Sequence, residues 1–150
     1  MNDFETSLNR MLADTFNNIL KYEEVSLRNV LGVPVTITEV HIIEAVGNQE
    51  NRETTISRIA SLLNISKPTA TVAVMKLEQK GFVVKKPCER DARRIIVSLT
   101  DMGGRIDRMH RLFHAKMVKN ISRQFADAEK EVLLRAVKTL SEFFKSRVEA

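Results

Sequence analysis

The sequence predicts a mainly α-helical (α+β) fold: a winged helix-turn-helix with long helices at both ends. Two short amphipathic segments follow one another across a brief turn, which is typical of a helix-turn-helix. Directly after them the apolar pattern changes to two β-rich runs, at residues 82–84 and 94–99, around a charged loop. With only 5 Gly and 3 Pro in 150 residues, most of the remaining chain is expected to be helical.

The bulk composition indicates one globular domain. A chain of 150 residues, 43% of them hydrophobic, is long enough to bury a core of its own. No apolar run reaches the length of a membrane span, and the charged N-terminal segment is unlike a signal peptide. The single cysteine cannot form an intrachain disulfide, which fits a reducing compartment. We therefore expect a cytoplasmic protein without a membrane partner.

Charge is segregated along the chain. Residues 1–51 carry 3 Lys and Arg against 8 Asp and Glu, whereas residues 52–94 carry 10 against 4 and residues 104–123 carry 6 against 1. Such blocks place a basic field over one surface, and nucleic acid is the commonest partner of a basic field. A basic surface that is merely solvated is the alternative that charge by itself leaves open.

Two helices are predicted before the helix-turn-helix. Apolar residues at helical spacing predict the first over about residues 4–31, ended by Gly32. The second is predicted over residues 36–46. It begins with a capping box at Thr36, and Gly47 is expected to stop it.

The helix-turn-helix follows. Its first helix is predicted over residues 55–63, and Ser66 caps the second, which runs to Lys80 and is stopped by Gly81. Pro68 falls in the first turn of that second helix, where a missing N–H costs no helical hydrogen bond. The β-rich runs after Gly81 then form a hairpin, and a hairpin directly after a recognition helix is a wing.

Two long helices are predicted at the end of the chain, over about residues 101–122 and 127–147. Together with the first helix they carry more apolar residues than a small winged core can cover, so we expect them to form a homodimer across a two-fold axis. One enlarged monomeric helical domain is the alternative. The expected organisation is a single domain, 1–150, with a DNA-binding lobe at 36–100 and dimerisation helices at 1–32 and 101–150.

The helix after Ser66 has a face suited to the major groove. The helical period turns Ala70, Ala73, Val74 and Leu77 to the core and leaves the opposite face short, polar and basic near its N-terminus. Hydroxyl and N-terminal N–H groups can bind phosphate, while Thr and Val can contact base edges and thymine methyls. No Arg lies on this face, so specificity is expected to depend on apolar contacts and DNA shape. The candidate DNA contacts on this helix are Ser66, Lys67, Pro68, Thr69, Thr71, Val72 and Lys76.

The charged run at the tip of the hairpin supplies the second set of candidates. Arg90 is the candidate for insertion into the minor groove, whose negative potential favours cations. Arg93 and Arg94 are candidates for phosphate contacts. Asp91 is expected either to pair with Arg93 or to cap the turn and hold the loop in shape. Two further cations nearby are Lys85 and Lys86.

A helix-turn-helix, a wing containing Asp91-x-Arg93, and then Leu99-Thr100-x-x-Gly103 together resemble the MarR family of dimeric winged-helix transcriptional regulators. The resemblance covers nearly the whole chain. It implies that the recognition helix enters the major groove of double-stranded DNA, that a wing arginine reads the minor groove, and that the terminal helices build the dimer.

Segments 16–28, 36–44 and 108–118 are similar, more narrowly, to the FabT type of repressor of bacterial fatty-acid-synthesis genes. That resemblance implies a repressor that binds a pseudopalindromic operator more tightly when it is loaded with an acyl chain, the corepressor, delivered on acyl carrier protein. Two alternatives stay open: a MarR-type regulator of another small-molecule or stress response, and a winged-helix protein-interaction module that does not bind DNA.

Apolar side chains of the first and fifth helices could line a tunnel for an acyl chain, since Met adapts to flexible ligands; plain core is the alternative. These residues are Phe16, Ile19, Leu20, Met109, Phe113 and Met117. The second basic block is a candidate dock for the acidic carrier protein, or else a patch that touches DNA backbone or solvent. Its residues are Arg105, Arg108, Arg111 and Lys116.

No enzyme is expected, because no nucleophile–base set, phosphate loop or carboxylate pair appears. His110 and His114 have the i, i+4 spacing of two zinc ligands, but only His41, Cys88 and scattered carboxylates could complete a site. We therefore expect no metal and no cofactor other than the acyl chain. Cys88 is either a redox sensor or an ordinary turn residue.

Overall fold

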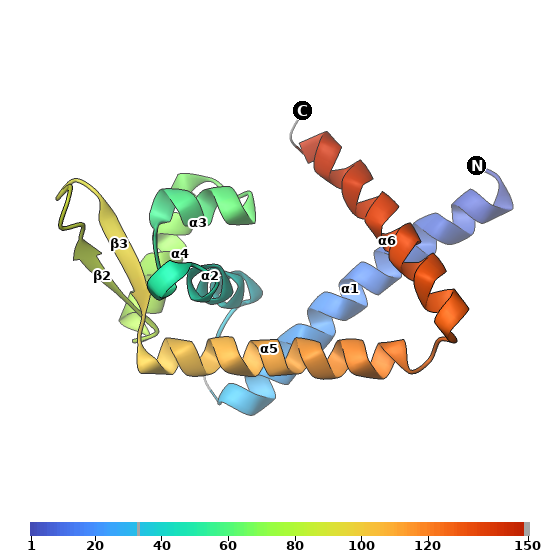
Figure 1. Ribbon diagram of the computed structural model, residues 1–150, viewed down its shortest axis with the longest axis horizontal. Helices are drawn as coiled ribbons and strands as arrows, with labels where there is room; N and C mark the ends of the chain where they lie inside the picture. Colours follow the sequence, from blue (N-terminus) through green and yellow to red (C-terminus); the bar gives the residue numbers. More distant parts are fainter. Residues whose placement is uncertain (33, 149–150) are drawn as a thin grey trace. The chain divides into compact units, whose positions relative to one another are not determined.

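The computed structural model describes residues 1–32 and 34–148 and forms two compact units, Met1–Arg111 and Leu112–Ala150 (Figure 1). The described helices include none long and apolar enough to cross a bilayer. The elements in chain order are α1 (Asp3–Leu31), α2 (Ile37–Gly47), η1 (Glu50–Arg52), β1 (Glu53–Thr55), α3 (Ile56–Leu63), α4 (Lys67–Gln79), β2 (Val83–Pro87), β3 (Ile95–Leu99), α5 (Asp101–Ser122) and α6 (Asp127–Val148).

Local hydrogen bonds explain why the helices begin where the sequence predicts. The Thr36 side chain accepts a hydrogen bond from the Glu39 N–H (3.2 Å) and the Glu39 carboxylate accepts one from the Thr36 N–H (3.0 Å), which completes the predicted capping box of α2. Ser66 caps α4 by accepting from the Thr69 N–H (3.2 Å). Gly32 ends α1 in the left-handed conformation (φ 59°).

Gly47 differs from the expectation for a helix stop. It is the last residue of α2, and the Asn48 that follows is right-handed rather than left-handed. A Cβ at Gly47 would lie 2.7 Å from a carboxylate oxygen of Asp107. The glycine is therefore needed because α5 packs closely against the end of α2, which no local pattern reveals.

The core lies in the winged lobe, where α2, α3 and α4 pack together and against the sheet (Figure 1). Ile42 and Ile43 of α2 are completely buried, and so are Val74 of α4 and Val97 of β3. Leu27 of α1 and Ile106 of α5 add to the same cluster. Burial of this apolar area drives the lobe to fold as one piece.

The sheet has three antiparallel strands in the order β1-β3-β2, one more than the predicted hairpin. The additional strand, β1, pairs Thr54 with Val97 and immediately precedes α3. The hairpin itself pairs Val84 with Ser98 and Lys86 with Ile96. Three residues are too few to show an apolar alternation, so this strand could not be predicted from sequence.

The wing is joined to α5 by hydrogen bonds of one threonine. The Thr100 N–H donates to the Phe82 carbonyl (3.1 Å) and its hydroxyl donates to the Gly81 carbonyl (2.7 Å). The same hydroxyl oxygen accepts from the Gly103 N–H (3.1 Å), so Thr100 also acts as the N-cap of α5. The start of α5 is thereby fastened to the chain that leaves the recognition helix.

Several long helices leave apolar side chains in solvent. In α1, Phe4, Met11 and Phe16 are 72%, 63% and 64% exposed. In the second unit, none of the described residues of α6 is buried, and Leu134 is 71% exposed. Exposed apolar faces of this kind are typical of surfaces that bind a partner.

Candidate nucleic-acid interface

Helix α4 presents the face that its sequence period predicts. Ala70, Val74 and Leu77 are completely buried and Ala73 is half-buried. The opposite face is open to solvent, and all seven candidate DNA contacts lie on it or at its N-terminus: Ser66, Lys67, Pro68, Thr69, Thr71, Val72 and Lys76.

The hydroxyl groups of this face are already engaged within the helix. Ser66 and Thr69 share a hydrogen bond between their hydroxyl oxygens (2.7 Å). The Thr71 hydroxyl donates its proton to the Lys67 carbonyl (2.8 Å). Because a hydroxyl has a single proton, Thr71 in this rotamer offers a base edge only an acceptor or its methyl group.

The wing loop keeps its shape through Asp91. The Asp91 carboxylate accepts a hydrogen bond from the Arg93 N–H (3.1 Å), and the Asp91 carbonyl accepts one from the Arg94 N–H (2.9 Å). Of the two roles predicted for Asp91, the structure therefore shows the turn cap. Among the described residues no carboxylate lies within ion-pair distance of Arg90, Arg93 or Arg94, and all three are exposed.

Asp91→Ala is expected to weaken DNA binding about five-fold, since losing a turn hydrogen bond costs about 1 kcal/mol and loosens the loop that carries the arginines. Simple electrostatics predicts tighter DNA binding instead, because the substitution removes a negative charge. Asp91→Asn is the matched variant: it removes the same charge but keeps the acceptor oxygen, and should bind at least as tightly as the wild type. Fluorescence anisotropy with labelled DNA compares the three proteins, and equal affinities for the Ala and Asn variants would disprove the role of the turn.

One cleft brings the recognition helix and the wing together. Lys67 from α4 and Arg93 and Arg94 from the wing line an open space of about 290 Å³. The start of α3, with Thr55 and Ser57, closes the other side. Three cations beside the N-terminus of a helix suit a DNA phosphate. The sequence did not predict a contribution from α3, although it placed the start of that helix at residue 55.

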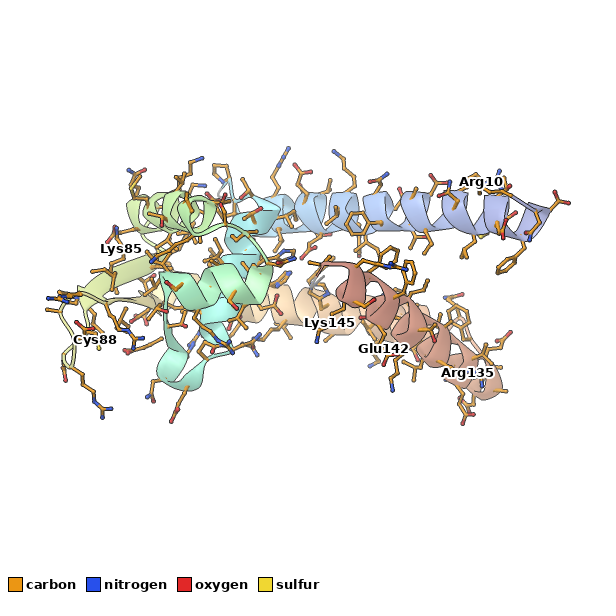
Figure 2. The ribbon with its side chains drawn as sticks, turned by 90° about the horizontal axis from the view of Figure 1, so that it is seen from above. Arg10, Lys85, Cys88, Arg135, Glu142 and Lys145 are labelled. Carbon is orange, nitrogen blue, oxygen red and sulfur yellow. The ribbon has the colours of Figure 1, made fainter. Side chains whose placement is uncertain are left out.

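Lys85 and Lys86, the two cations near the wing arginines, form ion pairs with glutamates. The Lys85 ammonium pairs with Glu78 (2.9 Å) and the Lys86 ammonium with Glu53 (2.8 Å). The hydrogen bond to Glu53 raises the pKa of Lys86. Lys85 and Cys88 both lie on the wing (Figure 2), and the Cys88 N–H donates to the Arg94 carbonyl (2.8 Å) as an ordinary turn residue would.

The residues of the candidate carrier-protein dock differ in their surroundings. Arg105 and Arg108 are exposed and line an open cleft of about 600 Å³ together with Arg52. Arg111 instead donates to the buried Asp107 carboxylate (3.1 Å), and that hydrogen bond raises the pKa of Arg111. Lys116 is exposed in the second unit. Arg105 and Arg108 of the first unit and Lys116 of the second are thus exposed, whereas Arg111 is engaged with Asp107.

The candidate acyl-chain residues differ in exposure. In the first unit, Phe16 and Ile19 are 64% and 41% exposed, and Leu20 and Met109 are half-buried. Phe113 and Met117 belong to the second unit, and both are half-buried there. The tunnel itself stays a prediction.

A three-stranded sheet with a cationic hairpin, packed beside a helix with an exposed polar face, defines a winged helix-turn-helix protein. The model of the MarR family matches residues 35–95 of the chain. FabT of Streptococcus pneumoniae, in a crystal structure with DNA, is 30% identical, with a TM-score of 0.90 over 95% of this chain and 98% of FabT.

Two curated bacterial regulators are also similar. The transcriptional regulator ZitR of Lactococcus lactis is 25% identical over 147 residues, which cover 93% of this chain and 99% of ZitR. The HTH-type transcriptional regulator PchR of Bacillus subtilis is 27% identical over 130 residues, which cover 86% of this chain and 75% of PchR. The chain belongs to the MarR family. Its curated relatives are transcriptional regulators rather than enzymes.

Proposed function

We propose that the protein is a cytoplasmic repressor of fatty-acid-biosynthesis genes, which binds double-stranded operator DNA as a homodimer and binds it more tightly in the presence of acyl-acyl carrier protein. The observation that carries the proposal is the similarity to FabT over nearly the whole of both chains. FabT was crystallised with DNA, and the exposed faces of α4 and the wing are the surfaces that a winged helix uses for that purpose.

In the proposed complex α4 lies in the major groove and Arg90 enters the adjacent minor groove. The cleft lined by Lys67, Arg93 and Arg94 receives a backbone phosphate between the two. The two kinds of contact have different roles. The phosphate contacts set the register of the protein on the DNA, while the short side chains of α4 approach base edges.

The exposed apolar side chains of the long helices support the homodimer. Faces such as those of Phe16 on α1 and Leu134 on α6 are costly to leave in water, and a second copy covers them by symmetry. A dimer presents two recognition helices to a pseudopalindromic operator, with half-sites about one helical turn, or roughly 34–36 Å, apart.

Binding to fragments upstream of the host's fatty-acid-biosynthesis genes tests the proposal. We expect footprints of two half-sites and an affinity that falls steeply with salt, with a log–log slope of about −0.9 for each neutralised phosphate. Acyl-acyl carrier protein should raise the affinity, whereas carrier protein without an acyl chain should not. Failure to bind any such fragment contradicts control of fatty-acid-biosynthesis genes, and binding that does not respond to the acylated carrier contradicts the enhancement by acyl-acyl carrier protein.

Reversing the charges of Arg105 and Arg108 to Glu is expected to abolish the enhancement by acyl-acyl carrier protein, because an acidic carrier is then repelled instead of attracted. Basal DNA affinity serves as the internal control. If it is unchanged and the enhancement is lost, the cleft beside Arg52 is the dock. If basal affinity falls instead, these arginines contact the DNA backbone, and an enhancement that survives intact contradicts the dock.

A further inference from the structure

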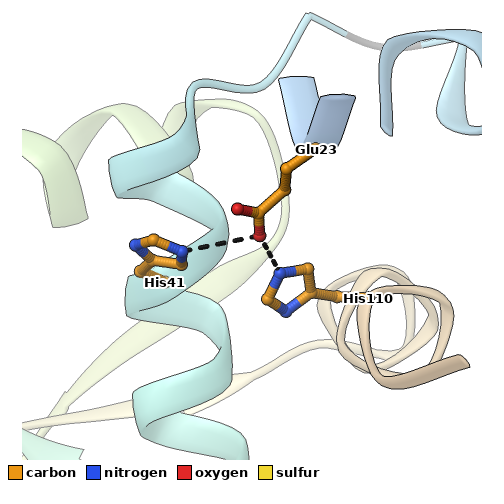
Figure 3. Close-up of side chains that lie close together, drawn as sticks. All are labelled: Glu23, His41 and His110. Carbon is orange, nitrogen blue, oxygen red and sulfur yellow. Dashed lines mark hydrogen bonds and ion pairs between the residues drawn. The ribbon is translucent and has the colours of Figure 1, made fainter. Parts of the chain in front are cut away.

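Side chains from three helices converge on one point of the first unit (Figure 3). Glu23 comes from α1, His41 from α2 and His110 from α5. The Nε2 atom of His41 lies 3.5 Å from Oε1 of Glu23, and the Nε2 atom of His110 is hydrogen-bonded to the same oxygen. One ligand atom from each residue lies within 4.8 Å of the others, so all three point inward to a shared centre.

The cluster is buried and rich in negative charge. Glu23 and His110 are 2% and 0% exposed. A second carboxylate, that of Glu44, stands 3.5 Å from the other ring nitrogen of His110, Nδ1. The Glu44 side chain is 37% exposed, so Glu23 is the buried carboxylate of the group. A buried carboxylate beside two imidazole rings is a donor set that suits a divalent cation.

The donor set selects the class of metal. Two imidazole nitrogens and one carboxylate oxygen, without sulfur, are the ligands of an open zinc site with three protein donors and one free position. Bonds of about 2.0–2.2 Å to a tetrahedral ion place its donor atoms roughly 3.3–3.6 Å apart, which includes the 3.5 Å between Nε2 of His41 and Oε1 of Glu23. His41 is the member that reaches solvent, with 37% of its side chain exposed, and this gives an ion a way in.

Glu44 adds an independent feature of metal sites. A histidine that binds a metal through one nitrogen usually donates the N–H of the other to a carboxylate, which sets its tautomer and orientation. The Glu44 carboxylate stands within ion-pair distance of Nδ1 of His110, where it could serve as such a partner, and Nε2 faces the centre of the cluster.

We propose that Glu23, His41 and His110 bind a divalent transition-metal ion of the zinc class, with Glu44 as a positioning residue for His110. An ion there would tie α1 and the first part of α5 to α2. Helix α2 packs directly on the recognition helix α4, so the site lies one helix away from the proposed DNA surface. The proposal does not depend on the acyl ligand or on the genes controlled.

Metal titration of the full-length protein, stripped with a chelator, is the test. We expect one Zn²⁺ per chain in competition with a chromophoric chelator, and the visible absorption of a four-coordinate nitrogen–oxygen site when Co²⁺ is added. Glu23→Gln, His41→Gln and His110→Gln should each weaken binding by about 100-fold or more, beyond the usual effect of losing an outer-shell partner. Glu24→Gln is the matched control: it removes the same charge from the next position of α1, where Glu24 is exposed and pairs with Arg28, and it should bind as the wild type does.

Spectra of the wild-type protein test the metal site even if a variant fails to fold. The chain has 3 histidines, and ¹⁵N spectra of their rings should show Zn²⁺ shifting Nε2 of both His41 and His110. The proposal is overturned by the absence of stoichiometric binding, by binding that shifts His114 alone, or by equal affinities of the Glu23→Gln and Glu24→Gln proteins. No DNA or carrier protein is present, so failure here is separate from failure of the proposed function.

Discussion

Neutralising the two wing arginines, Arg90→Ala with Arg93→Ala, is expected to lower operator affinity by at least about 100-fold. An arginine that binds DNA contributes about 1–3 kcal/mol, and both arginines would be missing from each protomer of the proposed dimer. The salt dependence should become shallower by about 1 in log–log slope for each phosphate that the variant no longer binds. Titrations at several salt concentrations measure both effects.

The structure favours a large effect because the side chains of Arg90 and Arg93 are available to bind DNA. Both are exposed, and no carboxylate among the described residues pairs with them, so DNA meets no competing ion pair. Arg93 also shares its cleft with Lys67, which places it next to the recognition helix. Fold stability should stay unchanged, since surface substitutions away from buried or paired groups usually alter it by less than about 0.5 kcal/mol.

Arg10→Ala is the matched control for the removal of charge. Arg10 is an exposed cation on α1, well outside the winged lobe in sequence (Figure 2). A general reduction of positive charge would weaken DNA binding in the control as well, whereas a specific wing contact leaves the control close to wild type. Unchanged affinity in the double variant would show that the wing does not touch DNA.

Gly103→Ala is expected to destabilise the protein by about 2 kcal/mol or more, although alanine is the better helix former by about 1 kcal/mol. Gly103 lies in the first turn of α5, where the backbone after the recognition helix passes against it. A Cβ at this position would lie 2.0 Å from the Phe82 carbonyl oxygen. That oxygen already accepts the Thr100 N–H, so it cannot move without breaking the junction between wing and α5.

Gly104→Ala provides the comparison, since it makes the same chemical change at the next residue of the helix. The three atoms nearest to a Cβ there would all belong to the guanidinium of Arg52, the closest at 2.9 Å, and the end of a flexible side chain can move away. Thermal or urea denaturation should therefore show a neutral or slightly stabilised Gly104→Ala protein and a clearly destabilised Gly103→Ala protein. Equal stabilities would mean that the backbone at Phe82 relaxes freely.

The structure gives the Leu99-Thr100-x-x-Gly103 pattern a physical meaning. Thr100 caps α5 and holds the end of the wing, and Gly103 leaves room for the Phe82 carbonyl one helical turn later. The pattern was visible in the sequence as a family resemblance. Its cause is a close approach of two backbones, which a sequence alone does not show.

Contacts between residues far apart in the sequence could not be predicted either, because they too depend on how the helices pack. The pairing of Glu39 with Lys80 joins residues 41 positions apart, and the hydrogen bond between Glu23 and His110 joins residues 87 positions apart. The structure places His110 with Glu23 and His41, of which His41 was named from the sequence as a residue that could complete a metal site. Glu23 was not singled out, since a glutamate in an amphipathic helix is normally a solvated residue.

The sequence by itself determined the order and approximate ends of the helices, the buried face of α4 and the charged turn between the two wing strands. Each depends on residues no more than a few positions apart, whose spacing directly sets which groups can meet. Only the tertiary structure decided the third strand, the ion pairs that occupy Lys85 and Lys86, and the cluster of Glu23, His41 and His110. These arise when elements distant in the chain pack together, because burial of their shared apolar faces, rather than any local pattern, brings such side chains together.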